Sequence, residues 1–218
     1  MIPDNLRQAL SDANEKIAEK RFRRMGLVPV RLDKLGKRKR PERKRPDFRL
    51  DDGAKRPVVI CEVKTIFSGG QVKDKKFLAS TLDPEHLGKG PFSFDVDFSD
   101  MDGAVANAIV KYRELVEDFP RLARVPLVVA FFFDEFADHF DLYRADMDRF
   151  KDVAGILKVE SDHLRNLVAR TMSSDDLKAL IKSASMAGMP QSTKGFRLLK
   201  NTCARLRLPR DFVARCIT

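Results

Sequence analysis

The amino-acid sequence predicts an α/β fold in which a central mixed sheet carries helices on both faces. Stretches with the 3.6-residue apolar period of helices alternate along the chain with short strand-like stretches, which is the element order of such folds. Residues 125–133 are apolar without interruption, as is typical of a strand covered on both sides. With 218 residues, of which 43% are hydrophobic, the chain can build one large domain, or one domain with an extension.

The first part of the chain is predicted to contain one helix and three strands. Residues 5–25 form the helix, because their apolar side chains recur near a 3.6-residue period, and Gly26 is suited to end it as a cap. The strands are expected at residues 27–32, 47–50 and 58–65. Residues 36–46 carry too much charge and proline for any element except a loop.

The second part of the chain continues the alternation and then becomes basic. Strands are expected at residues 92–98, 125–133 and 153–159, and a helix with a wide apolar face at residues 103–119. The remainder is predicted to be mostly helical, with Ser173 or Ser174 as an N-cap. We therefore divide the chain into an α/β core at residues 1–160 and a basic, mostly helical C-terminal extension at residues 161–218.

Composition favours a polyanionic partner and a cytoplasmic setting. The 42 lysines and arginines exceed the 32 aspartates and glutamates, and the formal charge of +10 favours phosphate-rich polymers over the alternative of a basic protein with no such partner.

No apolar run approaches the ~20 residues that span a bilayer, and the N-terminal residues lack a signal peptide's apolar centre, so no membrane association is expected. The three cysteines, without metal-site spacing, favour a reduced cytoplasmic setting.

The strand expected at residues 58–65 ends in an unusual pair of charges. Side chains alternate along a strand, so Glu62 and Lys64 share one face, and leaving either of them buried and unpaired would cost several kcal/mol. A simple ion pair at a wet strand end is one explanation. Asp47 suggests another, because a tight turn after its strand would bring its carboxylate beside that of Glu62. Converging carboxylates raise each other's pKa unless a cation is supplied, and Mg²⁺ suits such oxygen ligands.

These residues resemble a known family. Pro46-Asp47, followed by Glu62-Val63-Lys64 after an apolar strand, is similar to the motif of the PD-(D/E)xK nuclease superfamily. The resemblance implies a three-layer α/β/α core of the restriction-endonuclease-like fold, and a metal-dependent endonuclease that hydrolyses phosphodiester bonds in DNA. Asp47 and Glu62 would bind Mg²⁺, with Mn²⁺ as a substitute, and Lys64 would position or activate the attacking water.

A glutamate on the helix before the motif often completes the site in that family. Glu15 is followed by Ala18, Phe22 and Gly26, a spacing that resembles the helix of the smaller resolvase-like members. Glu19 is the competitor, with Phe22 as its neighbour three residues on. We favour Glu15 as the fourth catalytic residue.

The helix expected at residues 103–119 departs from one pattern of the family. A Gln-x-x-x-Tyr motif is missing there, since Tyr112 has the right phase but Ala108 occupies the glutamine position. This disfavours an exonuclease-like subgroup without affecting the predicted catalytic residues. Lys111 on the same helix is carried only as a minor candidate.

A basic run lies immediately before Asp47. We expect it to hold the phosphate backbone of a nucleic acid beside the metal, through Lys37, Arg38, Lys39, Arg40, Arg43, Lys44 and Arg45. Seven such contacts predict a log–log salt dependence of binding with a slope of roughly −6 for duplex DNA. A solvated basic loop is the alternative, and phosphate contacts would not read base sequence in any case.

Other functions compete with the nuclease hypothesis. The main alternative is a non-catalytic module that retains the fold and binds nucleic acid or another chain. DNA is the expected partner, although the pattern does not separate DNA from RNA. A homodimer is also considered, because many nucleases of this fold pair in order to cut two strands. The basic C-terminal tail is expected to be a second backbone contact, a mount for another chain or a solvated helix.

Overall fold

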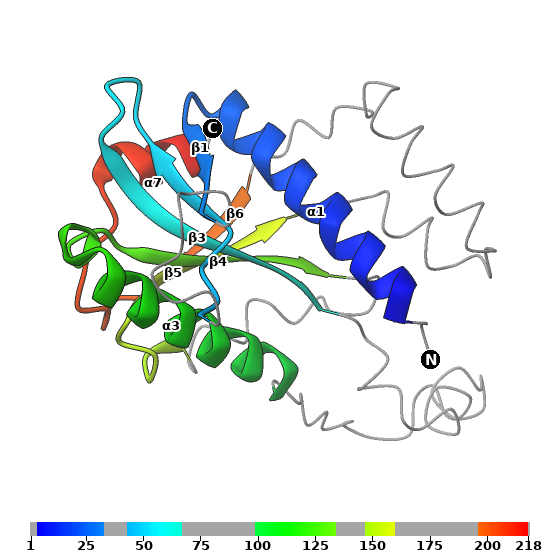
Figure 1. The fold of residues 1–218 in the computed structure, drawn as a ribbon. Helices are drawn as coiled ribbons and strands as arrows, with labels where there is room; N and C mark the ends of the chain where they lie inside the picture. The colour runs from blue at the N-terminus through cyan, green and yellow to red at the C-terminus, as the bar shows by residue number, and fades with distance from the viewer. Residues whose placement is uncertain (1–3, 33–42, 67–98, 134–146, 160–195, 218) are drawn as a thin grey trace, which may run out of the picture.

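The computed structural model describes residues 4–32, 43–66, 99–133, 147–159 and 196–217, and these form a mixed sheet with helices on both faces (Figure 1). The elements are the helices α1 (Asp4–Arg24), α3 (Ser99–Asp118) and α7 (Arg210–Ile217), the 3₁₀ helix η2 (Pro120–Leu122), and the strands β1 (Val28–Arg31), β2 (Phe48–Asp51), β3 (Pro57–Ile66), β4 (Leu127–Phe133), β5 (Val153–Val159) and β6 (Phe196–Lys200). The α/β prediction is therefore confirmed, and every strand and helix expected within the described residues before position 160 is present.

The six strands of the sheet lie in the order β1-β2-β3-β4-β5-β6. Neighbouring strands run antiparallel from β1 to β3, parallel from β3 to β5, and antiparallel again between β5 and β6. Parallel neighbours need a crossover connection, and α3 lies in the chain between β3 and β4. Because β3 and β4 are central and parallel, both of their faces are covered.

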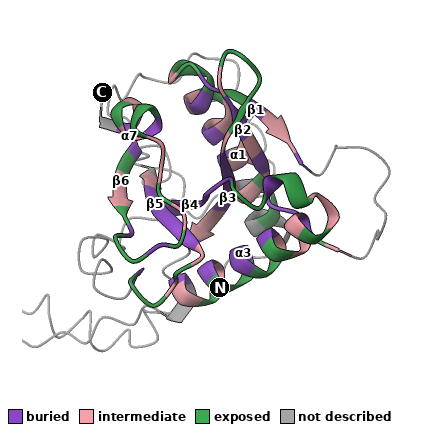
Figure 2. Ribbon diagram, turned by 90° about the vertical axis from the view of Figure 1, so that its left-hand side faces the viewer, coloured by how far each residue is buried: buried purple, intermediate pink, exposed green. Residues whose placement is uncertain are grey.

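Two apolar cores lie on the two faces of the sheet. On one face, alternate side chains of β3 and β4 pack against α3, with Leu115 among the residues of the helix. On the other face, the intervening side chains pack against α1 through Phe22 and against α7 through Phe212. Figure 2 shows that the buried residues gather in the central strands and on the sheet-facing sides of the helices. Among the described helices, none is both long and apolar enough to cross a membrane.

The end of α1 confirms the cap predicted at Gly26. This residue has a φ of 73°, the left-handed region that glycine reaches without strain. Its N–H donates to the carbonyl of Arg23, and the N–H of Leu27 donates to that of Phe22, both at 3.0 Å, which is the Schellman pattern. Arg215 of α7 donates to the carbonyl of Met25 at 2.5 Å, so the two helices are tied together at this cap.

Residues 196–217 differ from the prediction of a mostly helical extension. Residues 196–200 form β6, which pairs with β5 as an edge strand, and only α7 is helical among residues 196–217. Phe196 and Phe212 are both buried in the core on the α1 face. The five residues of β6 show no clear alternation, and their pairing partner lies about forty positions earlier in the chain, so local pattern could not reveal the strand. The strand expected at residues 92–98 and the N-cap at Ser173 or Ser174 lie outside the described residues.

Replacing Phe212 tests whether α7 is part of the core. Its side chain is 0% exposed, so Phe212→Ala should lower the free energy of unfolding by about 3–5 kcal/mol through lost burial and a cavity. The neighbouring exposed residue provides the control, since Asp211→Ala should cost less than about 1 kcal/mol. Denaturant unfolding measures both, and equal effects of the two substitutions would contradict this packing.

Candidate active site

The β2–β3 hairpin brings Asp47 beside Glu62. Phe48 of β2 lies opposite Cys61 of β3, so the residue before Phe48 meets the residue after Cys61. The Oδ2 of Asp47 accepts a hydrogen bond of 2.7 Å from the N–H of Val63. The backbone carbonyl of the same aspartate accepts one of 3.0 Å from Leu32. Both neighbouring segments thus fix Asp47, and the two carboxylates converge as the sequence predicted.

Glu62 lies at the centre of the site and is 0% exposed. Strand alternation turns it and Lys64 toward the α3 face, where α3 supplies Lys111. The Oε1 of Glu62 lies 2.7 Å from the Nζ of Lys64 and 2.5 Å from that of Lys111. Its Oε2 is also buried but has no hydrogen-bond partner among the described residues, which is costly for a carboxylate oxygen. Within this part of the chain, one oxygen is therefore fully compensated and the other is not.

The proton affinity of Asp47 is high for a carboxyl group. Burial and then the negative charge of Glu62 raise its pKa from 3.8 to about 7, against the opposing hydrogen bond from the Val63 N–H. The charge of Glu15 also raises this pKa, and that of Lys111 lowers it. For Lys111, burial alone would lower the pKa, but the charge of Glu62 and the hydrogen bond to it raise the value overall, so the ammonium form is favoured.

The helix α1 brings Glu15, rather than Glu19, to the site. Glu15 forms an ion pair with Arg31 of β1, and its charge is felt by Asp47. Glu19 instead pairs with Arg23 one turn along the same helix, at 2.8 Å. The preference for Glu15 over its competitor therefore agrees with the placement of the two side chains.

The polar residue Asn14 also supports the site. Asn14 is buried and donates a hydrogen bond of 2.7 Å to the Oγ1 of Thr65, which fixes α1 against β3 beside Glu15. Asn14 was not among the predicted site residues, although a polar residue four positions from both Leu10 and Ala18, on the apolar stripe of the helix, was a usable signal.

Lys111 was only a minor candidate, and the structure gives it a contact with Glu62 as short as that of Lys64. It lies four positions before the fully buried Leu115, so its place beside the apolar face was the available signal. Tyr112 has a different role, because its hydroxyl donates to the carbonyl of Val125 at 2.7 Å and ties α3 to the segment before β4.

The end of the basic run is placed differently from the prediction of phosphate contacts. Arg43 pairs with Glu117 at 2.7 Å and with Asp118 at 3.6 Å. Arg45 is buried, lies 3.6 Å from Asp118 and sits over the ring of Phe119 at 5.1 Å. These two guanidinium groups anchor the loop to the end of α3, so we assign them a structural role in place of the predicted one.

The other residues of the basic run divide into two groups. Lys44 is exposed and remains suited to contact a phosphate. Lys37, Arg38, Lys39 and Arg40 lie outside the described residues, and their predicted contacts stay predictions.

Asp47 and Glu62 fit a hard divalent cation. Mg²⁺ is commonly held by one or two carboxylates while keeping several waters. Within the described ranges, the buried Oε2 of Glu62 lacks a partner, and such an ion would supply one. Among the described residues there is no group of three or more His, Cys, Asp or Glu arranged to hold a metal. The protein ligands would therefore be these two carboxylates, while Glu15 is engaged by Arg31 and acts on Asp47 through its charge.

Cys61 does not take part in this chemistry. It lies on the face of β3 opposite to Glu62 and is fully buried, and burial raises the pKa of its thiol well above the usual value. A buried neutral thiol is a packing group rather than a nucleophile.

Comparison with protein-family models, with curated proteins and with solved structures finds no match for this chain. The chemistry of the site therefore has to be derived from its own residues.

The raised pKa of Asp47 predicts a specific dependence of stability on pH. Between about pH 4 and pH 7 the folded protein holds a proton that the unfolded chain has lost, so this group makes stability fall as pH rises. Asp47→Asn removes the effect and keeps an acceptor for the Val63 N–H. Without divalent metal, the variant should gain stability relative to the wild type across this interval, by an amount of the order of 2–4 kcal/mol in denaturant unfolding.

A control of opposite sign is available at Asp52. Its pKa is lowered, first by the backbone N–H of Arg56 and then by the side chain of that arginine, so it adds stability as pH rises. Asp52→Asn should therefore lose stability relative to the wild type with rising pH. If both variants changed with pH in the same direction, Asp47 would not be a protonated carboxyl held by its surroundings.

Proposed function

We propose that this protein is a metal-dependent endonuclease that hydrolyses phosphodiester bonds in DNA, with a core of the restriction-endonuclease-like type. The observation that carries the proposal is the convergence of Asp47 and Glu62 in a site where one oxygen of Glu62 is buried with no partner from the described part of the chain. A lysine two residues further along the same strand completes the set. The mixed sheet with helices on both faces supports the assignment of the fold.

The roles of the side chains follow from their placement. A divalent ion bound here would polarise a phosphoryl oxygen and favour formation of hydroxide from water. Asp47 and Glu62 would hold the ion, and its charge would keep Asp47 ionised at neutral pH. Lys64 is 27% exposed and its Nζ lies on Glu62, from where it would orient the attacking water and offset charge in the transition state. Lys111 holds Glu62 in place through its ion pair.

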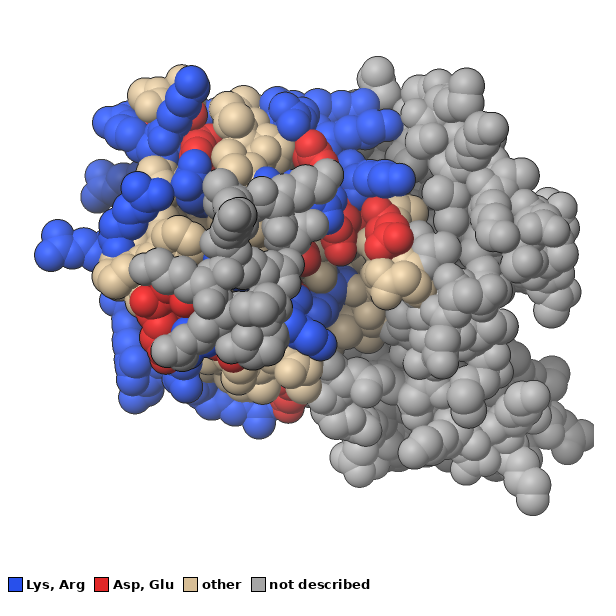
Figure 3. Space-filling model, in the orientation of Figure 1, with Lys and Arg blue, Asp and Glu red and all other residues tan. Residues whose placement is uncertain are grey.

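Electrostatics favour a nucleic acid as the substrate. Lysine and arginine outnumber the acidic groups on the described surface in Figure 3, in line with the formal charge of +10. Such a surface attracts the phosphate backbone and speeds association, with a strong dependence on salt. Lys44 lies in the chain three residues before Asp47, so a phosphate that it binds would be near the proposed site of cleavage.

A second function is favoured by one observation. Lys64 and Lys111 both lie on the Oε1 of Glu62, so the charge of this glutamate is already compensated without a metal. A non-catalytic module that binds nucleic acid could use the same cluster to hold β3 and α3 together. Binding of Mg²⁺ and cleavage of DNA separate the two functions.

A cleavage panel tests the nuclease proposal. Purified protein should cut or nick branched, nicked, single-stranded or duplex DNA with Mg²⁺ or Mn²⁺, and EDTA should stop the reaction. Glu62→Ala should abolish cleavage while salt-sensitive binding persists, and Lys64→Ala should slow cleavage by about 10²-fold or more. Glu15→Gln and Glu19→Gln form a matched pair on α1, and only the first should reduce the rate.

Two results would reject the nuclease assignment. One is cleavage that needs no metal, and the other is full activity of the Glu62→Ala protein. Absence of cleavage, together with no heat of Mg²⁺ binding in calorimetry and intact binding to DNA, would identify the non-catalytic module instead.

The revised roles of the basic run predict the salt dependence of DNA binding. With Lys37, Arg38, Lys39, Arg40 and Lys44 as the remaining contacts, the log–log slope should be about −4.5 rather than −6. Lys44→Ala should reduce its magnitude by about 0.9. Arg45→Ala should leave the slope unchanged and lower the free energy of unfolding by about 1–3 kcal/mol, because Asp118 loses a buried partner. A slope change with Arg45→Ala equal to that with Lys44→Ala would contradict the structural role of Arg45.

A further inference from the structure

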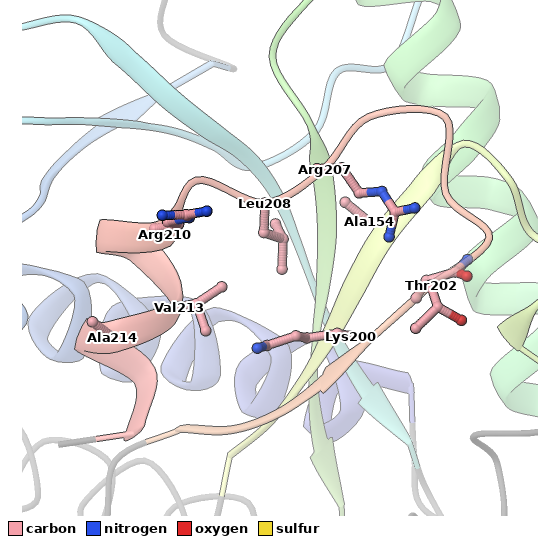
Figure 4. Close-up of a pocket in the computed structure, with 9 residues that line it drawn as sticks. Ala154, Lys200, Thr202, Arg207, Leu208, Arg210, Val213 and Ala214 are labelled. Atoms are coloured by element: carbon pink, nitrogen blue, oxygen red, sulfur yellow. The ribbon is translucent and has the colours of Figure 1, made fainter.

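A second cationic region lies between β6 and α7. The structure has a pocket of about 450 Å³ there, lined by Lys200 at the end of β6, by Arg207, and by Arg210 at the start of α7. Leu208 and Val213 are part of the same lining, and Figure 4 shows them between the basic side chains. The pocket therefore combines a basic rim with an apolar wall.

This pocket is separate from the candidate active site. Leu208 packs against the core on the α1 face of the sheet, whereas Glu62 and Lys64 share the α3 face of β3 with Ile60. The two places thus lie on opposite faces of the sheet, and β6 is its edge strand, three positions from β3 in the strand order. A ligand in the pocket would not share ligands with Asp47 or Glu62.

The charge of the pocket is not compensated within the described part of the chain. Lys200, Arg207 and Arg210 meet no carboxylate there, although the neighbouring Arg205 pairs with Asp152 at 3.0 Å. Arg210 is the first residue of α7, where the positive end of the helix dipole disfavours a cation. A bound anion would compensate both the side chains and the helix end.

The apolar wall is held in a fixed position. A Cβ atom at Gly155 would lie 2.9 Å from the carbonyl oxygen of Leu199 and 3.1 Å from the Cδ1 of Leu208, so only glycine lets β6 and Leu208 approach this closely. The volume falls within the ~300–1,000 Å³ of small-molecule sites and exceeds what a bare phosphate fills. A ligand with both an anionic group and a flat apolar group matches this lining.

We propose that the pocket binds a nucleotide, with its phosphate among Lys200, Arg207 and Arg210 and its base against Leu208 and Val213. The nucleotide is either free or part of a strand, since both present the same chemistry. The proposal goes beyond DNA hydrolysis and does not depend on it, because none of the pocket residues belongs to the candidate active site.

Calorimetry in EDTA tests the proposal without hydrolysis. The probes are AMP, adenosine, inorganic phosphate and a 12-nucleotide single strand. The wild type should bind AMP or the strand more tightly than adenosine and phosphate, and Arg207→Ala/Arg210→Ala should weaken that binding by about tenfold or more. Arg121→Ala/Arg205→Ala is the matched control, because it removes the same charge from exposed arginines outside the pocket and should have little effect.

A filling substitution tests the apolar wall. Ala214 is exposed and lines the pocket, so Ala214→Phe fills space there without changing the charge. This substitution should weaken nucleotide binding by at least as much as it weakens phosphate binding. Tighter binding of the strand than of AMP would identify a strand as the source, and the reverse would identify a free nucleotide. Absence of binding by AMP and strand, an equal loss in the two double variants, or phosphate binding as tight as AMP would overturn the proposal.

The outcome is distinguishable from that of the nuclease proposal. The Glu62→Ala protein should retain full nucleotide binding in the pocket, and the Arg207→Ala/Arg210→Ala protein should retain the metal dependence of any cleavage. Loss of nucleotide binding in the Glu62→Ala protein would place the nucleotide at the active site and overturn the pocket assignment.

Discussion

The burial of Glu62 in the middle of β3 is the constraint on which the site depends. A carboxylate with 0% exposure is tolerated only if cations reach it, because desolvation of an unpaired charge costs far more than one side-chain contact returns. Lys64 is supplied by the same strand, and Lys111 is supplied by α3, which ties the helix to the sheet. Their shared use of Oε1 leaves Oε2 with no partner among the residues that the structure describes. Stability alone would be served equally well by an apolar residue at this position.

Asp47 extends the same reasoning to the neighbouring strand. The Val63 N–H fixes its carboxyl beside Glu62, and burial and the charge of Glu62 then raise its pKa to about 7. Folding thus holds together two acidic groups that repel each other when both are ionised, a destabilising arrangement that is frequent at sites where the residues have a chemical task. Asn14 and the Glu15–Arg31 pair bring α1 to the same place, so elements from three segments of the chain converge there.

The part of this arrangement that follows from local geometry could be predicted from the sequence. The period of two along β3 put Glu62 and Lys64 on one face, and the short turn after β2 made Asp47 their neighbour, so both could be predicted. The contact of Lys111 with Glu62 depends on how α3 crosses the sheet, and the inward turn of Arg45 depends on Asp118, more than seventy residues away. The same limit applies to β6, whose partner strand is distant in sequence. Pairings between distant segments leave no periodic signal in either segment.

The charge balance of the site bears on the proposed reaction. Asp47 and Glu62, when ionised, are matched by Lys64 and Lys111, and Glu15 is matched by Arg31, so the site without a metal is close to neutral. A divalent ion would make the site positive by two charges. When hydroxide attacks a phosphodiester, which already carries one negative charge, the transition state carries two, so the two charges would be equal in size and opposite in sign. The two lysines would thus allow the carboxylates to hold a cation without cancelling its field at the phosphate. With leucines in their place, the carboxylates alone would neutralise the ion, and the electrostatic stabilisation of the transition state would be lost.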